Sequence, residues 1–165
     1  MKKYWITFIM LYTSLSFAQV DTRLTLIDKT NHALGELDTL IVDVEARSAG
    51  NGVVIHGFQG SIQVSDWLSN TDPIITFSDQ LFPATVYNTT EDYRFSKNRI
   101  RYVYTYNRGS AQSIGVSWIR AVRIMIIYQV TEQPIAFSWY KESPHFFVLN
   151  SDNETVTGME YKIEF

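Results

Sequence analysis

Hydrophobic and polar residues alternate along most of the chain, most clearly across residues 121–130. If this segment is extended, its side chains point alternately to two faces. One face then collects an apolar set: Val122, Ile124, Ile126, Tyr128 and Val130. The other face carries Arg123, Met125, Ile127 and Gln129. β-Branched and aromatic residues favour a strand over a helix, and apolar residues on both faces predict an interior position in a sheet.

The same period of two recurs in shorter segments separated by loops rich in Gly, Pro and Asn. These further strands are predicted at residues 23–27, 39–46, 53–64, 74–77, 85–87, 99–107, 135–140, 146–149 and 155–165. Residues 88–92 are predicted as a polar loop, and Asp66 begins a loop that crosses between layers. No helix of ordinary length is expected. About eight to ten strands of unequal length with long crossing loops favour an all-β sandwich of the jelly-roll type over a closed barrel.

The first 18 residues have the pattern of a secretory signal peptide. A basic start at Lys2 and Lys3 precedes the apolar run 4–15, and the small residues Ser16 and Ala18 follow. We expect cleavage after Ala18 and export to the periplasm or the extracellular space. A membrane anchor is the alternative, but the apolar run is shorter than the roughly 20 residues that span a bilayer. The remaining residues, 19–165, are predicted to form a single domain with no transmembrane segment.

Charge and cysteine content exclude several classes of function. Removal of Lys2 and Lys3 leaves 12 basic against 17 acidic residues, a net charge of −5. A nucleic-acid partner is therefore not expected, because phosphate binding requires a basic surface. The chain has no cysteine, which excludes thiol catalysis, thiolate metal sites and a lipid-modified cysteine anchor. Stability must come from packing rather than from disulfides, although the predicted compartment permits them.

Several segments resemble the cohesin-like modules, which share a jelly-roll fold with several carbohydrate-binding modules. Leu34-Gly35-Glu36-Leu37-Asp38, followed by the alternation of residues 39–44, is similar to the opening strand of that family. Gly57-Phe58-Gln59-Gly60 within residues 54–64 is similar to the second strand, and residues 66–68, 99–104 and 121–124 match later parts of the pattern. The resemblance covers most of residues 23–165. It implies a bacterial, non-catalytic binding module that recognises either a carbohydrate or another exported protein.

Aromatic side chains are the candidates for glycan binding, because a flat ring with a polar edge suits the two-faced character of a sugar. Trp67, Trp118 and Tyr140 are the candidate ligand-binding residues, since Trp67 and Trp118 lie near strand ends where binding residues gather. A second aromatic set shares strand faces with aliphatic residues, and we expect it to pack in the core: Tyr102, Tyr104, Tyr106 and Trp139.

For a protein partner, the candidate residues are Arg123, Met125 and Ile127, on the face of segment 121–130 opposite the core. An apolar centre with a polar rim is the usual anatomy of an interface. The alternative is that a loop of the same chain covers this face. A structural or accessory subunit of a bacterial envelope assembly, paired through exposed sheet edges, is the other function that the pattern allows.

No catalytic, metal or cofactor site is predicted. The loop acids Asp66, Asp72 and Asp79, or Asp152 with Glu154, offer oxygen ligands for calcium but lack the tight spacing of a dedicated calcium loop. The three histidines, His32, His56 and His145, are far apart in the sequence and belong to no zinc-binding or nucleophile motif. We therefore expect no enzyme activity.

Overall fold

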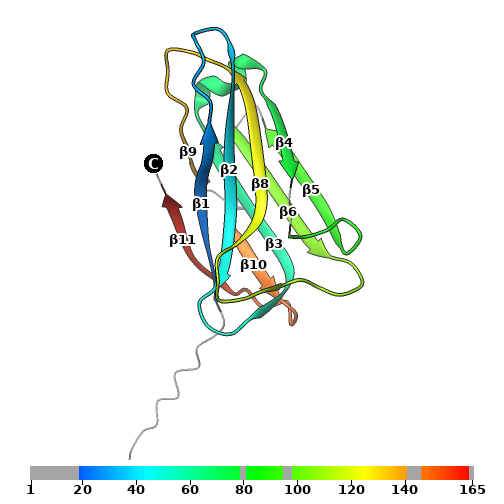
Figure 1. Cartoon of the computed structure of the whole chain (residues 1–165). Helices are drawn as coiled ribbons and strands as arrows, with labels where there is room; N and C mark the ends of the chain where they lie inside the picture. The colour runs from blue at the N-terminus through cyan, green and yellow to red at the C-terminus, as the bar shows by residue number, and fades with distance from the viewer. Residues whose placement is uncertain (1–18, 79–80, 95–97, 141–145, 164–165) are drawn as a thin grey trace, which may run out of the picture.

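Two β-sheets packed face to face form the molecule (Figure 1). The computed structural model describes residues 19–78, 81–94, 98–140 and 146–163, so the predicted signal peptide lies outside the described residues. The strands are β1 (Val20–Lys29), β2 (Leu37–Ser48), β3 (Val53–Val64), β4 (Ile74–Ser78), β5 (Tyr87–Arg94), β6 (Arg99–Tyr106), β7 (Ser113–Ile114), β8 (Ile119–Gln129), β9 (Phe137–Trp139), β10 (Phe147–Asn150) and β11 (Thr157–Ile163). A short 3-10 helix, η1 (Asp66–Thr71), joins β3 to β4. The predicted all-β jelly-roll sandwich is confirmed.

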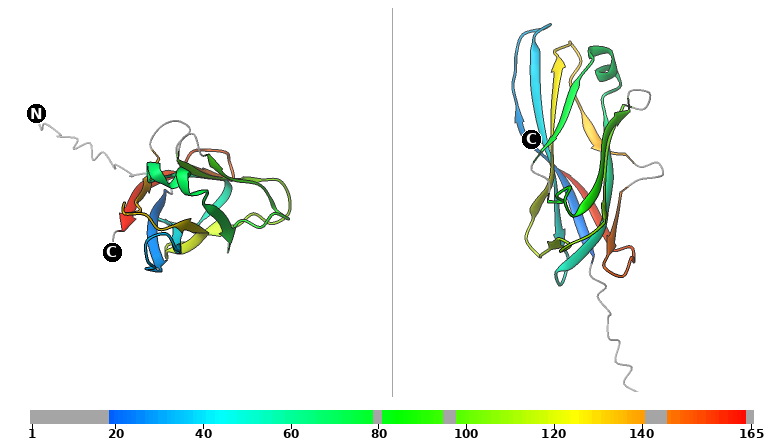
Figure 2. Two further views of the ribbon diagram at one scale, coloured as in Figure 1. Left: turned by 90° about the horizontal axis from the view of Figure 1, so that it is seen from above. Right: turned by 90° about the vertical axis from the view of Figure 1, so that its right-hand side faces the viewer.

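The strand order shows how distant segments meet. One sheet has five strands in the order β11-β1-β2-β8-β4, antiparallel throughout except for the parallel pair of β1 and β11. The second sheet is built on β3, in the order β10-β3-β6-β5, with β7 and β9 paired to other parts of β3. Viewed from the side, the two sheets form separate layers (Figure 2). The core lies between them.

Strand β8 is an interior strand, between β2 and β4, as its pattern predicts. Its alternate residues Val122, Ile124 and Ile126 are at most 1% exposed and point into the core. On β2, Val42 lies opposite Ile124 and Val44 opposite Val122, so the two strands present one continuous apolar surface to the second sheet.

Aromatic side chains fill the half of the core that the second sheet contributes. Tyr102 and Tyr104 of β6 are fully buried, and Phe82 stacks between Tyr104 and Phe58 with ring centroids 5.0 and 4.9 Å away. The expectation that Tyr102, Tyr104 and Trp139 pack in the core is confirmed, Trp139 being 7% exposed. Offset and tilted ring pairs of this kind add to the stabilisation that burial alone provides.

Strand β5 replaces the loop predicted at residues 88–92, so that prediction was wrong. Its polar sequence belongs to an edge strand: Tyr87 points inward and is buried, whereas most of the others are partly or fully exposed. Glu91 is held by the hydroxyl of Tyr104, which donates to its Oε1 over 2.5 Å. An edge strand buries little surface, and hydrophobic alternation therefore does not detect it.

Three smaller differences concern strand bounds. β8 begins at Ile119 rather than at Ala121, and it is preceded by β7 and an irregular stretch in which Val116 is 63% exposed. The predicted crossing loop after β3 forms η1, and β1 is longer at both ends than residues 23–27. Among the described residues, no helix is long and apolar enough to cross a membrane.

Candidate functional site

The outer face of the five-stranded sheet carries a group of apolar side chains, which we call the apolar patch: Ile41, Ile74, Met125 and Ile127, flanked by Ile27 and Leu37. The pairing of strands brings it together. Met125 lies between Ile41 of β2 and Thr76 of β4, and Ile127 lies between Thr39 and Ile74.

Exposure distinguishes the apolar patch from the core. Ile27 is 46% exposed, Leu37 63% and Ile74 59%, while Met125 and Ile127 are half-buried in the middle of the sheet. The described ribbon leaves the upper parts of β2 and β8 uncovered on this face (Figure 1). Large apolar side chains gathered on one surface mark a contact site more often than scattered ones do.

Ion pairs continue this face beyond the apolar patch. Arg123 donates to both carboxylate oxygens of Asp43, from Nε over 2.7 Å and from Nη2 over 2.8 Å. On the neighbouring strands, Arg23 donates to Glu45 over 2.6 Å, and Arg47 pairs with Asp21 at 3.3 Å. Arg120 of β8 also lies opposite Glu45, so the arginines and carboxylates on this part of the face largely compensate one another.

The environment of Glu45 shows how closely these charges are coupled. Burial raises the pKa of the Glu45 carboxyl, but hydrogen bonds from Arg23 and Thr25 outweigh that effect and hold the pKa below its ordinary value. Glu45 is therefore ionised at neutral pH and remains paired.

Trp118 belongs to this row of ion pairs rather than to an open platform. The guanidinium groups of Arg23 and Arg47 lie 4.5 and 4.6 Å from the centre of its ring, at cation–π distance. The indole thus stacks with two arginines of β1 and β2, at the end of the face opposite the apolar patch.

The other two glycan candidates lie on different surfaces. Trp67 of η1 donates its indole N–H to the carbonyl of Pro134 over 3.2 Å and lies 5.8 Å from the ring of Tyr128. Since Trp118 and Tyr128 stand at opposite ends of β8, the two tryptophans are about 30 Å apart at the strand rise of ~3.3 Å per residue. Tyr140 follows β9 and covers the guanidinium of Arg99 at 4.7 Å. The structure does not bring the three together.

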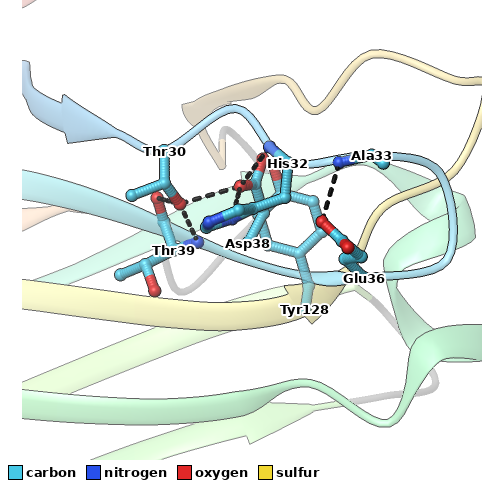
Figure 3. Close-up of polar contacts among 7 residues, drawn as sticks. All are labelled: Thr30, His32, Ala33, Glu36, Asp38, Thr39 and Tyr128. Atoms are coloured by element: carbon cyan, nitrogen blue, oxygen red, sulfur yellow. Dashed lines mark hydrogen bonds and ion pairs between the residues drawn. The ribbon is translucent and has the colours of Figure 1, made fainter.

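A polar cluster missed by the sequence analysis surrounds Asp38 (Figure 3). Asp38 is 3% exposed, and its Oδ1 accepts hydrogen bonds from the hydroxyl of Thr30 over 2.7 Å and from the backbone N–H of His32 over 3.2 Å. His32 Nδ1 lies 2.9 Å from the same oxygen, and the hydroxyl of Tyr128 donates to Oδ2 over 3.3 Å. Thr30 and His32 lie 8 and 6 positions from Asp38, but Tyr128 lies 90 positions away, so the sequence alone did not reveal the complete cluster.

These contacts fix the electrostatics of the cluster. Burial raises the pKa of Asp38, but the hydrogen bonds from Thr30, His32 and Tyr128 prevail and hold it below the ordinary value of 3.8. Burial and the neighbouring Asp38 raise the pKa of Tyr128 to about 12. A cavity of about 230 Å³ adjoins the cluster and is lined also by Lys29 and Gln133.

The Asp38–His32 pair has the geometry of an oriented imidazole, but the hydroxyl of Thr30 beside it is already engaged. Thr30, the nearest hydroxyl, donates to Asp38 and accepts from the N–H of Thr39. The hydrogen bonds of Asp38 hold the segment between β1 and β2 and connect it to Tyr128 of β8. His56 stacks on Tyr106 with ring centroids 4.4 Å apart, and His145 lies outside the described residues.

The acidic residues considered for calcium do not converge either. Within residues 19–78, 81–94, 98–140 and 146–163, no group of three acidic or histidine side chains could hold a metal ion. Asp66 accepts a hydrogen bond from Asn98, and Asp152 and Glu154 belong to a turn whose N–H groups bond to Asn150. Asp79 lies outside the described residues.

Comparison with known proteins extends the interpretation of the fold. No protein-family model matches the sequence, and no curated protein matches it. Among solved structures, the chain is similar to a type II cohesin domain from the cellulosome of Acetivibrio cellulolyticus, with a TM-score of 0.56 and 12% identity over 88% of this chain and 92% of that one. A type I cohesin from Clostridium thermocellum, solved in complex with a dockerin, has a TM-score of 0.58 and 12% identity over 88% and 99% of the two chains.

A further type II cohesin module, the second of the adaptor scaffoldin of Acetivibrio cellulolyticus, has a TM-score of 0.52 and 9% identity, over 91% of this chain and 95% of that one. The chain therefore has a cohesin-like β-sandwich fold. At 9–12% sequence identity, the similarity to these cohesins establishes the fold alone.

Proposed function

We propose that this chain is an exported, non-catalytic module that binds another protein through the apolar patch. The observation that carries the proposal is the gathering of exposed apolar side chains on one sheet face, built around Met125 and Ile127. The cohesin-like fold supports it, since cohesins among the similar structures were solved as complexes with dockerins.

The chemistry of the face indicates which kind of partner it accepts. The charges next to the apolar patch are already compensated, Arg123 by Asp43 and Arg23 by Glu45. A highly charged ligand would therefore find little attraction here. The expected partner is a folded exported protein with an apolar contact surface, for which burial of Met125 and Ile127 supplies affinity and Arg123 contributes to the polar rim.

Two matched lysine substitutions test this assignment. Met125→Lys places a charge in the apolar patch, and Val103→Lys places one on the outer face of the second sheet, where Val103 is also half-buried. The partner captured from the cell envelope is purified, and its affinity for each variant is measured by calorimetry. We expect Met125→Lys to weaken binding about tenfold or more, as for a central interface residue, and Val103→Lys to leave it unchanged.

Three results would contradict the proposal. Loss of binding in Val103→Lys alone would move the interface to the other sheet. Unchanged binding in Met125→Lys would remove the apolar patch from the interface. Retention on a polysaccharide panel that is abolished by Trp67→Ala, Trp118→Ala or Tyr140→Ala would instead establish carbohydrate binding.

A further inference from the structure

The outer edge of the five-stranded sheet is formed by β4, whose sequence is Ile-Ile-Thr-Phe-Ser. β4 pairs with β8 over all five residues on one side. Within the described part of the chain, no backbone hydrogen bond reaches its other side. In Figure 1, β4 lies to the right of β8, and in the right-hand view of Figure 2 this side of the molecule faces the viewer. It thus offers a row of backbone donors and acceptors.

The other long edge strands carry charges, and β4 does not. β5 contains Glu91, Asp92 and Arg94, and the sequence of β11 contains Glu160 and Lys162. Charged residues on an edge are a common means of preventing strands of other chains from adding to the sheet. The edge of β10 is protected differently, because the N–H of Val156 donates to its Val148 carbonyl. Of the described edge strands with five or more residues, β4 alone lacks this protection.

The sequence of β4 is also complementary to itself when two copies run antiparallel. With Thr76 opposite Thr76, Ile75 of one copy lies opposite Phe77 of the other, and this pair occurs twice because of the symmetry. Both side chains pack against the core side of the sheet, where a β-branched residue opposite an aromatic one is a favourable pair. On the outer side, Thr76 pairs with Thr76 and Ile74 with Ser78, so no like charges meet.

We propose that two copies of this chain pair through β4, antiparallel, about a two-fold axis at Thr76. The two five-stranded sheets then join into a single sheet of ten strands with both apolar patches on the same side. Five residues of edge pairing bury less surface than a standard interface, so the dimer is weak and depends on concentration. This inference goes beyond the proposed function and does not rest on it.

Opposite charges at the two-fold axis provide the test. Thr76 is exposed, so Thr76→Lys and Thr76→Glu should each fold normally, which circular dichroism and thermal unfolding check. In the dimer each variant would place two like charges against each other. Light scattering over a range of concentrations should show the unaltered mature protein dimerising, and the dissociation constant of each variant should rise about tenfold or more. An equimolar mixture of the two variants should dimerise again.

The control variant is Thr90→Lys, an exposed position on the charged edge strand β5, and it should dimerise like the unaltered protein. A protein that stays monomeric at its highest soluble concentration overturns the proposal, as does a Thr76→Lys dimer of undiminished affinity or a mixture that stays monomeric. Met125→Lys should dimerise normally, so failure of the apolar patch as a binding site and failure of β4 pairing are distinguishable. If one copy of this chain forms a complex with a strand of another protein and no dimer forms, the proposal is also overturned.

Discussion

Gly60 illustrates how one residue in the middle of a strand adapts the backbone to the core. The ring of Tyr102 lies directly across it, so that a Cβ at this position would overlap the phenol oxygen and the carbon that bears it. Tyr102 is fully buried and stacks with Phe58 at 5.9 Å, and it has little room to move. Glycine is needed here for space.

Gly60→Ala should therefore destabilise the protein by about 1–3 kcal/mol, the usual cost of overpacking a filled core. Chemical denaturation measures the change. Gly115→Ala is the control, because nothing lies within 4 Å of the added carbon there, and its free energy of unfolding should change by less than about 0.5 kcal/mol. Equal effects of the two substitutions would show that the close approach to Tyr102 is not the cause.

At the scale of single residues, alternation in the sequence predicted orientation well and environment poorly. It placed Met125 and Ile127 opposite the core face of β8, and the structure confirms that orientation. It could not show that Trp118 stacks on two arginines, because Arg23 and Arg47 belong to strands about 70 to 95 positions earlier. Such contacts depend on register between distant strands, which a period of two does not encode.

Among the elements, the β1–β2 hairpin has a buried carboxylate, Asp38, in addition to its apolar contacts with the core. Asp38 binds Thr30 and His32 of the connecting segment and Tyr128 of β8, and so joins the hairpin to the neighbouring strand. The pKa of its carboxyl is lowered in the folded protein, because these hydrogen bonds outweigh the effect of burial. Its contribution to stability is thus present above the unfolded pKa and is lost as the pH falls through the folded pKa.

Asp38→Asn should reduce the free energy of unfolding at pH 7 by about 1–3 kcal/mol, the range for hydrogen bonds to a charged buried group. The difference from the unaltered protein should shrink as the pH falls below roughly 4, where the carboxylate becomes protonated. Urea denaturation at a series of pH values gives both quantities. Asp152→Asn, at an exposed turn, is the control and should have little effect at any pH. If the difference in the free energy of unfolding between Asp38→Asn and the unaltered protein stays constant from pH 7 to pH 3, the negative charge of Asp38 does not stabilise the fold.

Strand prediction was most successful for interior strands and failed at an edge. β2 and β8 are buried mainly on one side, which produces the alternation that the sequence shows, and β3 is buried on both sides between Gly57 and Ile62. β5 is polar because little covers it, and its sequence resembles a loop. The missing information lies in the neighbouring strand β6, whose backbone pairs with β5 along all eight residues.

For the molecule as a whole, the sandwich was predictable from the sequence and the arrangement of its strands was not. The apolar patch shows the difference: Met125 and Ile127 could be proposed from β8 alone, whereas Ile41 and Ile74 join them only through pairing with β2 and β4. The Asp38 cluster likewise combines residues from three segments of the sequence.

Export of the whole molecule is a prediction from the first 18 residues. Mass spectrometry of the protein isolated from the producing cell should find a chain that begins at Gln19, because the small residues Ser16 and Ala18 suit a signal peptidase. Ala18→Lys provides a variant in which cleavage should be impaired. A cell-derived protein that retains Met1 would contradict the prediction and favour a membrane anchor.

The parallel pairing of β1 with β11 has a consequence for the order of folding. This pairing brings residues 20–25 beside residues 157–163. β1 is therefore paired with β2 on one side early in the chain, but with β11 on its other side only after residues 157–163 are made. Contacts between such remote segments require loop closure before they contribute stability, and a high share of them slows folding. A chain still emerging from a ribosome or a translocation channel would leave one side of β1 open until residues 157–163 arrive, and would depend until then on protection from aggregation.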